Sequence, residues 1–140
     1  METWVIYAIL SMVFAGLTSV LAKYGLQNIN PDLGLGIRTT TIFFLITIFN
    51  FATNKLKDLP LITHKQLILL VCSGLTTTFS WIFYYRAMKD GPLSYVAAID
   101  KASIVITLVL SFVLLKEPMS PKIIIGATLI FAGMLVLIWK

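Results

Sequence analysis

Five long apolar blocks divide this chain of 140 residues, and they constrain its fold more than any other feature. Each block holds roughly 17–23 residues, the length that an α-helix needs to cross the ~30 Å hydrocarbon layer of a bilayer. Composition agrees, because 59% of the residues are hydrophobic and only 12% are charged, about half of what a soluble domain carries. We therefore predict an all-α integral membrane protein with five transmembrane helices in a single domain, 1–140. The blocks lie at about residues 4–22, 33–52, 67–85, 93–115 and 123–139.

Short connectors with helix-start signals separate the blocks. Asn30-Pro31, Gly91-Pro92 and Ser120-Pro121 each stand before a block. A small or polar cap followed by Pro favours a helix start, because Pro at the first helical position loses no N–H that the helix needs. Short loops predict that sequential helices are antiparallel neighbours. The longest loop, residues 53–66, carries the single histidine, His64, which we interpret as a solvated loop residue.

The sequence carries no signature of a soluble catalyst. It has no Gly-rich phosphate loop. With a single histidine, His64, and a single cysteine, Cys72, it has no Cys/His cluster for a metal and no nucleophile paired with a base. We therefore expect no enzyme activity, no metal and no cofactor. The net charge of +5 fits contacts with anionic lipid at the ends of the helices better than nucleic-acid binding. The expected location is the cell membrane.

Polar and small side chains recur inside three blocks at steps of three, four or seven residues, so each set shares one helical face. The sets are Tyr7, Ser11, Thr18 and Ala22; Ser73, Thr77, Ser80 and Tyr84; and Asp100, Ser103, Thr107 and Ser111. Three such faces can line a central cavity, where bundled helices usually bind a solute. Alternatively, the hydroxyl groups mark helix–helix contacts, where small polar residues allow close approach.

Asp100 and Lys101 lie inside the fourth block, and Asp100 is ~10 Å along the helix from Leu93. A charge at such a depth is costly and indicates a functional site. Adjacent helical residues point about 100° apart, so we expect the two charges to have different partners. Asp100 would face the cavity, and Lys101 would face a neighbouring helix, water, or a carboxylate such as Glu117 of the partner subunit. The alternative is a structural charge pair that holds helices together.

The basic residues do not fix the orientation in the membrane. The N-terminal side of a five-helix chain would hold Lys55, Lys57, Lys65, Lys116 and Lys122, and the other side Lys23, Arg38, Arg86, Lys89 and Lys140. Orientation normally follows an excess of Lys and Arg on the cytoplasmic side, and here the two sides are equal. Either the tie is a coincidence and the first helix decides, or copies insert both ways. Two oppositely inserted copies would form a pseudo-two-fold pair like the inverted repeats of longer transporters.

Short motifs follow one another along essentially the whole chain. They are Ala22-Lys23-Tyr24-Gly25, Arg38, WIFYYRAMKDGP at residues 81–92, IDKAS at residues 99–103 and LKEP at residues 115–118. Their order and spacing resemble a single EamA-type repeat of the drug/metabolite transporter superfamily in its five-helix form. The resemblance implies export or exchange of small metabolites through a helical basket. Longer members contain two inverted halves, so a chain with one repeat implies a homodimer.

The fifth block carries a second likeness, G-x-x-L-I-x-x-G, formed by Gly126, Leu129, Ile130 and Gly133. The pattern is similar to one on the dimerising last helix of the related small multidrug resistance proteins. Both glycines share a face and permit close helix contact, so we expect a dimer interface there; packing within one subunit is the alternative. Those proteins export cations with a Glu in their first helix. The first block here has no acidic residue, so the resemblance does not extend to that mechanism.

These observations predict a transporter of small polar or amphipathic metabolites that acts as an antiparallel homodimer by alternating access. The alternative is a non-transporting membrane subunit that binds a partner membrane protein. Aromatic faces and hydroxyls could bind substrate, although Trp4 and Trp81 also suit anchoring at the membrane interface, and Arg38 and Arg86 suit snorkelling to water. The expected substrate-binding residues are Tyr7, Ser11, Arg38, Ser80, Trp81, Tyr84, Tyr85, Tyr95, Asp100, Lys101 and Ser103.

Overall fold

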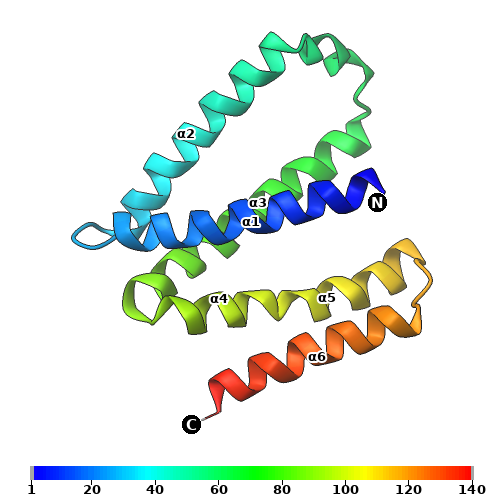
Figure 1. Ribbon diagram of the computed structural model, residues 1–140. Coiled ribbons are helices and arrows are strands. Elements are labelled where there is room, and N and C mark those ends of the chain that lie inside the picture. Colours follow the sequence, from blue (N-terminus) through cyan, green and yellow to red (C-terminus); the bar gives the residue numbers. More distant parts are fainter. Residues whose placement is uncertain (1, 140) are drawn as a thin grey trace. The chain divides into compact units, whose positions relative to one another are not determined.

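The computed structural model describes residues 2–139, and within that range it contains helices and turns but no strand (Figure 1). Lys140, counted above among the basic residues, lies outside the described residues. Five segments are long and apolar enough to cross a membrane, which confirms the predicted fold class. They are α1 (Thr3–Gly25), α2 (Pro31–Ala52), α3 (His64–Asp90), the segment Leu93–Leu115 and α6 (Pro121–Ile138).

A side-chain cap begins each of the two helices, α2 and α6, whose cap residue is followed by Pro. The Asn30 side chain accepts a hydrogen bond from the N–H of Asp32 at 2.8 Å, and the Ser120 hydroxyl accepts one from the N–H of Ile123 at 3.3 Å. In both helices Pro follows the cap at the first position, as the sequence indicated. Before Leu93, by contrast, Pro92 itself holds the cap position and no side chain bonds to the helix.

The chain divides into two compact units, Met1–Asp90 and Gly91–Lys140. In the first unit, α2 and α3 lie together where α2 begins and α3 ends, and they diverge toward a short 3₁₀ helix, η1 (Lys55–Leu61) (Figure 1). The interpretation of residues 53–66 as a plain loop was wrong in two respects, since it contains η1 and since His64 begins α3.

The early start of α3 has a local cause that the sequence contained. The Gln66 side chain accepts hydrogen bonds from the N–H and the hydroxyl of Thr63, both at 2.9 Å, and the N–H of Gln66 donates to that hydroxyl at 3.4 Å. Thr-x-x-Gln is therefore a capping box, which satisfies N–H groups that a helix start leaves unpaired. It moves the beginning of α3 three residues ahead of the apolar block that started at Leu67.

Buried apolar side chains of the first unit gather at its closed end, where α1 ends, α2 begins and α3 ends. Leu26 and Tyr85 are each 2% exposed, Leu35 is 7% exposed, and Met88 is fully buried. Gly34 permits this packing, because a Cβ atom at that position would stand 2.5 Å from Cδ2 of Leu26. The closed end is thus the part of the first unit in which buried side chains of α2, of α3 and of the connector after α1 pack together.

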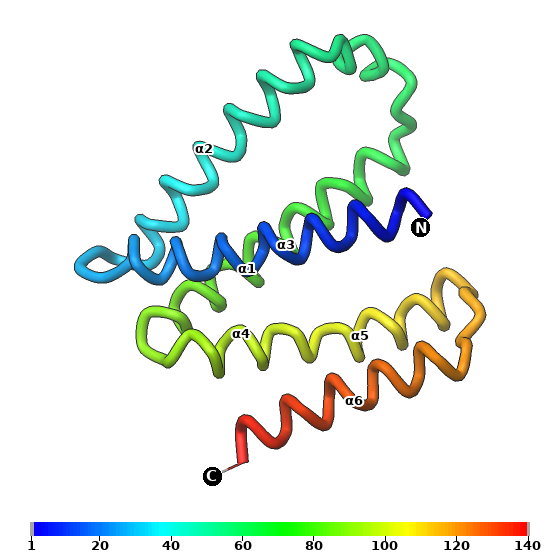
Figure 2. Tube along the Cα trace, viewed as in Figure 1, coloured from blue at the N-terminus to red at the C-terminus, as the bar shows by residue number. Residues whose placement is uncertain are grey.

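The second unit is a hairpin in which α6 returns along α4 (Leu93–Lys101) and α5 (Ser103–Leu110) (Figure 2). The fourth block was predicted to be one continuous helix, and the structure instead interrupts it at Ala102. The N–H of Ala102 bonds to the carbonyl of Ile99, and that of Val105 to the carbonyl of Ala102, each at 3.0 Å. These are bonds to the third residue back, so the helix tightens locally just after Asp100 and Lys101.

Candidate functional site

The Arg38 side chain extends from α2 onto two aromatic rings of α3. Its guanidinium carbon lies 4.4 Å from the centroid of the Trp81 ring and 5.7 Å from that of Tyr85. Trp81 and Tyr85 are four residues apart, so their rings share one face of α3. A cation over an aromatic face is stabilised by about 0.5–1 kcal/mol in water and by more when it is desolvated. The structure therefore brings together three of the predicted substrate-binding residues.

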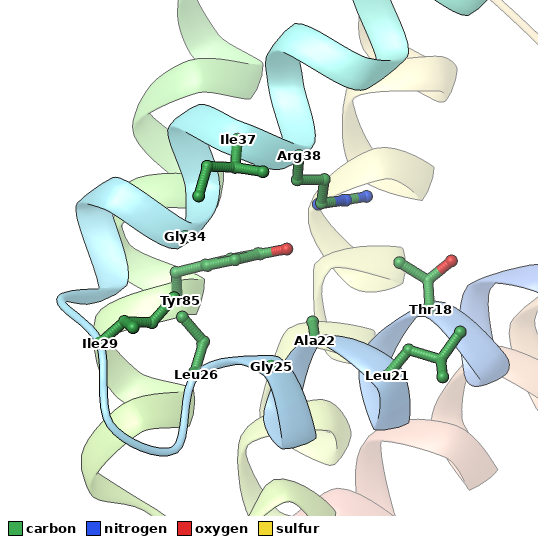
Figure 3. Close-up of a pocket in the computed structure, with 10 residues that line it drawn as sticks. All are labelled: Thr18, Leu21, Ala22, Gly25, Leu26, Ile29, Gly34, Ile37, Arg38 and Tyr85. Atoms are coloured by element: carbon green, nitrogen blue, oxygen red, sulfur yellow. The ribbon is translucent and has the colours of Figure 1, made fainter.

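A pocket of about 440 Å³ opens beside this cluster. In Figure 3 the Tyr85 ring extends across it, with its hydroxyl directed toward the side where Arg38 and Thr18 lie, while Leu26 and Ile29 occupy the opposite end. The lining is therefore apolar over most of its area and polar at one side. The residues that line it, all from the first unit, are Thr18, Leu21, Ala22, Gly25, Leu26, Ile29, Gly34, Ile37, Arg38 and Tyr85.

A bidentate ion pair joins α3 to the first turn of α2 next to this pocket. Nε and Nη2 of Arg86 donate to the two carboxylate oxygens of Asp32 at 3.0 and 2.8 Å. Asp32 also lies at a helix N-terminus, where the peptide dipoles favour a negative charge. Snorkelling to water was the expectation for Arg86; its side chain is exposed, and the structure adds a carboxylate partner. Asp32 was not among the predicted residues, although an acidic residue in a first helical turn was a signal for it.

Two lysines link the C-terminal ends of α1 and α3, since each donates hydrogen bonds to backbone carbonyl groups at or just after the end of the other helix. The Lys23 ammonium donates to the carbonyl groups of Met88 and Lys89, and the Lys89 ammonium donates to those of Leu26 and Gln27 at 2.6 and 3.1 Å. Carbonyl groups at a helix C-terminus lack partners within the helix and carry partial negative charge, so cations stabilise them. The lysine contacts and the ion pair together fasten the closed end of the first unit.

Tyr84 forms a further contact between α1 and α3, as its hydroxyl donates to the Ser19 hydroxyl at 3.1 Å. Ser19 was not on the predicted polar face of the first block. Thr18, Thr77 and Thr107 were on predicted faces, but their hydroxyls donate to the carbonyl four residues back in their own helix. Such bonds satisfy a hydroxyl without any neighbouring helix. Thr77 and Thr107 therefore fit local satisfaction better than a polar cavity wall, whereas Thr18 also lines the Arg38 pocket.

The remaining predicted binding residues of the first unit, Tyr7, Ser11, Ser80 and Tyr84, do not line the Arg38 pocket. Tyr7 precedes Thr18 by eleven residues on α1, which places it ~16 Å along the helix from that pocket lining. Within residues 2–139, no hydrogen bond is found for the side chains of five of the predicted binding residues, and all five are exposed. These are Tyr7, Ser11, Ser80, Tyr95 and Ser103.

Asp100 and Lys101 pair with each other, because Nζ of Lys101 lies 3.3 Å from Oδ2 of Asp100. The expectation that the two charges would face different partners is therefore wrong for this chain. The long lysine stem is flexible enough to fold back onto its neighbour despite the ~100° between the two directions. No cluster of three or more metal-ligating side chains is found in residues 2–139, so Asp100 is not part of one.

The G-x-x-L-I-x-x-G face of α6 points away from the rest of its unit. A Cβ atom at Gly126 or Gly133 would meet no atom within 4 Å, and Leu129 and Ile130 are exposed. The neighbouring face of α6 does the packing, since Ile124, Ala127, Thr128 and Phe131 line a pocket of about 200 Å³ with residues of α5. Within the second unit, the two glycines therefore have space for a close helix contact.

Comparison with known proteins gives two findings. The sequence profile described as the EamA-like transporter family matches residues 2–139. A curated protein from Sinorhizobium sp., named "Uncharacterized transporter in cobO 3'region", is 37% identical to this chain over 136 residues, which is 97% of this chain and 96% of that protein. No solved structure matches the chain.

Proposed function

This chain belongs to the EamA-like transporter family, and on that premise we propose that it moves small polar or amphipathic metabolites as an antiparallel, dual-topology homodimer by alternating access. The family and the five membrane-spanning helices make it a multi-pass protein of the cell membrane and a transporter in general. Both the family and the relative's name point to a transporter that is not an enzyme. We take residues 1–140 as a single EamA-like domain.

The observation that carries the proposal is the pocket between α1, α2 and Tyr85. Its volume of about 440 Å³ is in the range of ~300–1,000 Å³ typical of small-molecule sites. Its lining is largely apolar, with the Arg38 guanidinium and the Tyr85 hydroxyl at one side (Figure 3). A small solute with one polar end and one apolar end matches such a lining.

Alternating access requires one end of the helical unit to close while the other is open. The closed end of the first unit is held by polar contacts, namely the Asp32–Arg86 ion pair and the bonds from Lys23 and Lys89. Exposed ion pairs contribute little net stability, so the Asp32–Arg86 pair can break and re-form at low cost. Toward η1 the same helices α2 and α3 diverge (Figure 1). In the proposed cycle the polar contacts open as the divergent end closes.

A second copy would complete the helical assembly. Among the described residues, buried apolar side chains are restricted to Leu26, Leu35, Tyr85, Met88 and Met134, so most apolar side chains of the helices remain for lipid or another chain. The open face with Gly126 and Gly133 on α6 suits close contact with a partner helix. The equal numbers of basic residues on the two sides suit insertion in both orientations.

Transport is tested by reconstituting the purified protein in liposomes, after a thermal-shift screen of metabolites has selected compounds for uptake. We expect uptake to exceed that of empty liposomes and to fall with Arg38→Gln, whereas Lys55→Gln, which removes a charge from η1 outside the pocket, leaves it unchanged. A folded dimer that moves none of the compounds that stabilise it would contradict transport. It would favour the alternative, a subunit that binds a partner membrane protein.

Dual topology is tested with reporters fused after Lys140. We expect signal from both sides of the membrane. Adding two lysines to one side should lock the orientation and lower uptake, because each copy then lacks an oppositely inserted partner. A single orientation of the unmodified protein would refute dual topology while leaving transport itself open to the liposome assay.

A further inference from the structure

We propose that the Arg38 pocket binds an anionic group, so that the cargo is a small organic anion with a carboxylate or phosphate head and an apolar body. This inference rests on the proposed function, because it names the substrate class of the same pocket. It adds the sign of the charge and the position of the group that recognises it.

Among the basic side chains at the closed end, Arg38 differs from the others in its partners. Arg86 is paired with Asp32, and the ammonium groups of Lys23 and Lys89 bond to backbone carbonyls. Within the described part of the first unit, residues 2–90, no carboxylate and no hydrogen-bond acceptor is found for the Arg38 side chain, and its contacts are the rings of Trp81 and Tyr85. None of the residues that line the pocket is acidic.

The Arg38 guanidinium is a positive charge within α2, one of the membrane-spanning segments. An ionised side chain within a membrane-spanning segment is costly unless another group compensates it. Aromatic faces attract the cation, but they carry no formal negative charge. They also offer no oxygen to accept hydrogen bonds from the guanidinium N–H groups. The missing partner is therefore a negative group that enters the pocket.

The geometry leaves the required donors available. The Arg38 N–H groups form no hydrogen bond within the described part of the first unit, and a guanidinium presents its N–H groups in the arrangement that binds carboxylate or phosphate at two oxygens. The Tyr85 hydroxyl is directed toward the same side of the pocket (Figure 3), and no hydrogen bond is found for it within residues 2–139. Arg38 and Tyr85 can thus donate to one anionic group.

The other end of the pocket determines what accompanies the anion. Leu26 and Ile29 lie there, and Leu21 and Ile37 add further apolar surface (Figure 3). An inorganic ion would leave this surface and most of the 440 Å³ without a ligand. An amphipathic anion fills both parts, so the pocket favours organic acids or phosphate esters with a short hydrocarbon body.

Binding can be measured through Trp81 itself. A variant with Trp4→Phe and Trp139→Phe keeps Trp81 as the single tryptophan, and its emission is titrated in phosphatidylcholine nanodiscs. The probes are hexanoate, hexyl phosphate and hexylammonium, which share a hydrocarbon body and differ in the charge of the head. We expect a saturable change with the two anions and at least about tenfold weaker binding of hexylammonium.

Arg38→Gln should weaken binding of hexanoate about tenfold or more, and Arg38→Lys should restore part of it, because the charge returns without the two-point geometry. Lys55→Gln is the matched control, as it removes one positive charge outside the pocket and should leave the affinity unchanged. Partial recovery in Arg38→Lys, with the same elution of all variants in gel filtration, separates loss of recognition from loss of folding.

Equal binding of hexylammonium and hexanoate, or unchanged affinity in Arg38→Gln, would overturn the inference. Nanodiscs that contain phosphatidylglycerol test the other source of an anionic head. If that lipid abolishes hexanoate binding, the site is a lipid-headgroup site and the inference fails. Anion binding that depends on Arg38, without uptake in liposomes, would uphold the inference about the pocket and refute transport. Uptake without preference for anions would uphold transport and refute the inference about the pocket.

Discussion

Gly34 offers the sharpest test of the packing at the closed end. It lies in the first turn of α2 and lines the pocket, and a Cβ atom there would stand 2.5 Å from Cδ2 of Leu26 and 3.4 Å from Cδ1 of Ile29. Two residues later, Gly36 is also helical, but a Cβ atom at Gly36 would meet nothing within 4 Å. Gly34→Ala and Gly36→Ala are thus the same chemical change with and without a steric conflict.

The magnitudes can be worked from this geometry. Replacing Gly by Ala inside a helix stabilises it by about 1 kcal/mol, and we expect that gain for Gly36→Ala. At Gly34 the added methyl group must displace the end of the Leu26 side chain, which is only 2% exposed. Overpacking of this kind costs about 1–3 kcal/mol. The free energies of unfolding of the two variants should therefore differ by about 1–3 kcal/mol, with Gly34→Ala the less stable.

The assay is reversible unfolding in mixed detergent micelles as the fraction of sodium dodecyl sulfate rises, followed by circular dichroism. A double-mutant cycle with Leu26→Ala isolates the conflict, because the truncated side chain leaves room for the new methyl group. In that background Gly34→Ala should become stabilising by about 1 kcal/mol, like Gly36→Ala in the unmodified chain.

Equal stabilities of Gly34→Ala and Gly36→Ala would refute the packing of α2 against Leu26. If Gly34→Ala destabilises the Leu26→Ala variant as much as the unmodified chain, the loss of stability does not come from the contact with Leu26. Hexanoate titration of the same variants gives a second readout, since a displaced Leu26 would occupy part of the pocket and weaken the binding detected through Trp81.

Three further predictions concern other parts of the chain. Asp100→Asn should assemble normally and abolish uptake in liposomes, whereas Lys101→Ala should lower both dimer yield and uptake in part; normal uptake by Asp100→Asn would remove that carboxylate from the mechanism. Asp32→Asn and Arg86→Gln should each lower the melting temperature, and the double variant should lose less than the sum, since both changes remove one ion pair; strictly additive losses would argue against the pair. Lys116, which has a φ of 55°, ends its helix in a left-handed conformation that Gly adopts without strain, so Lys116→Gly should stabilise the protein by about 1 kcal/mol and Lys116→Ala should not.

Local signals were sufficient to predict the elements of the fold. Apolar length determines which segments can span a bilayer, because an α-helix rises by a fixed 1.5 Å per residue. Caps determine where helices begin, and Asn30-Pro31 and Ser120-Pro121 act as the sequence indicated. The capping box at Thr63 and Gln66 is also a local signal, so the start of α3 could have been predicted from the sequence, although the apolar pattern alone missed it. The family was also legible, since its motifs lie in order along the chain.

The partners of the charged and aromatic residues were decided by the tertiary structure alone. Helical periodicity says which residues share a face of one helix, but it does not say how two helices are rotated and shifted against each other. The contact of Arg38 with Trp81 and the pairing of Asp32 with Arg86 depend on that rotation and shift between α2 and α3. The sequence determines which basic and aromatic residues lie near the closed end. The packing of the helices determines that Arg86 pairs with a carboxylate and that Arg38 lies at the pocket.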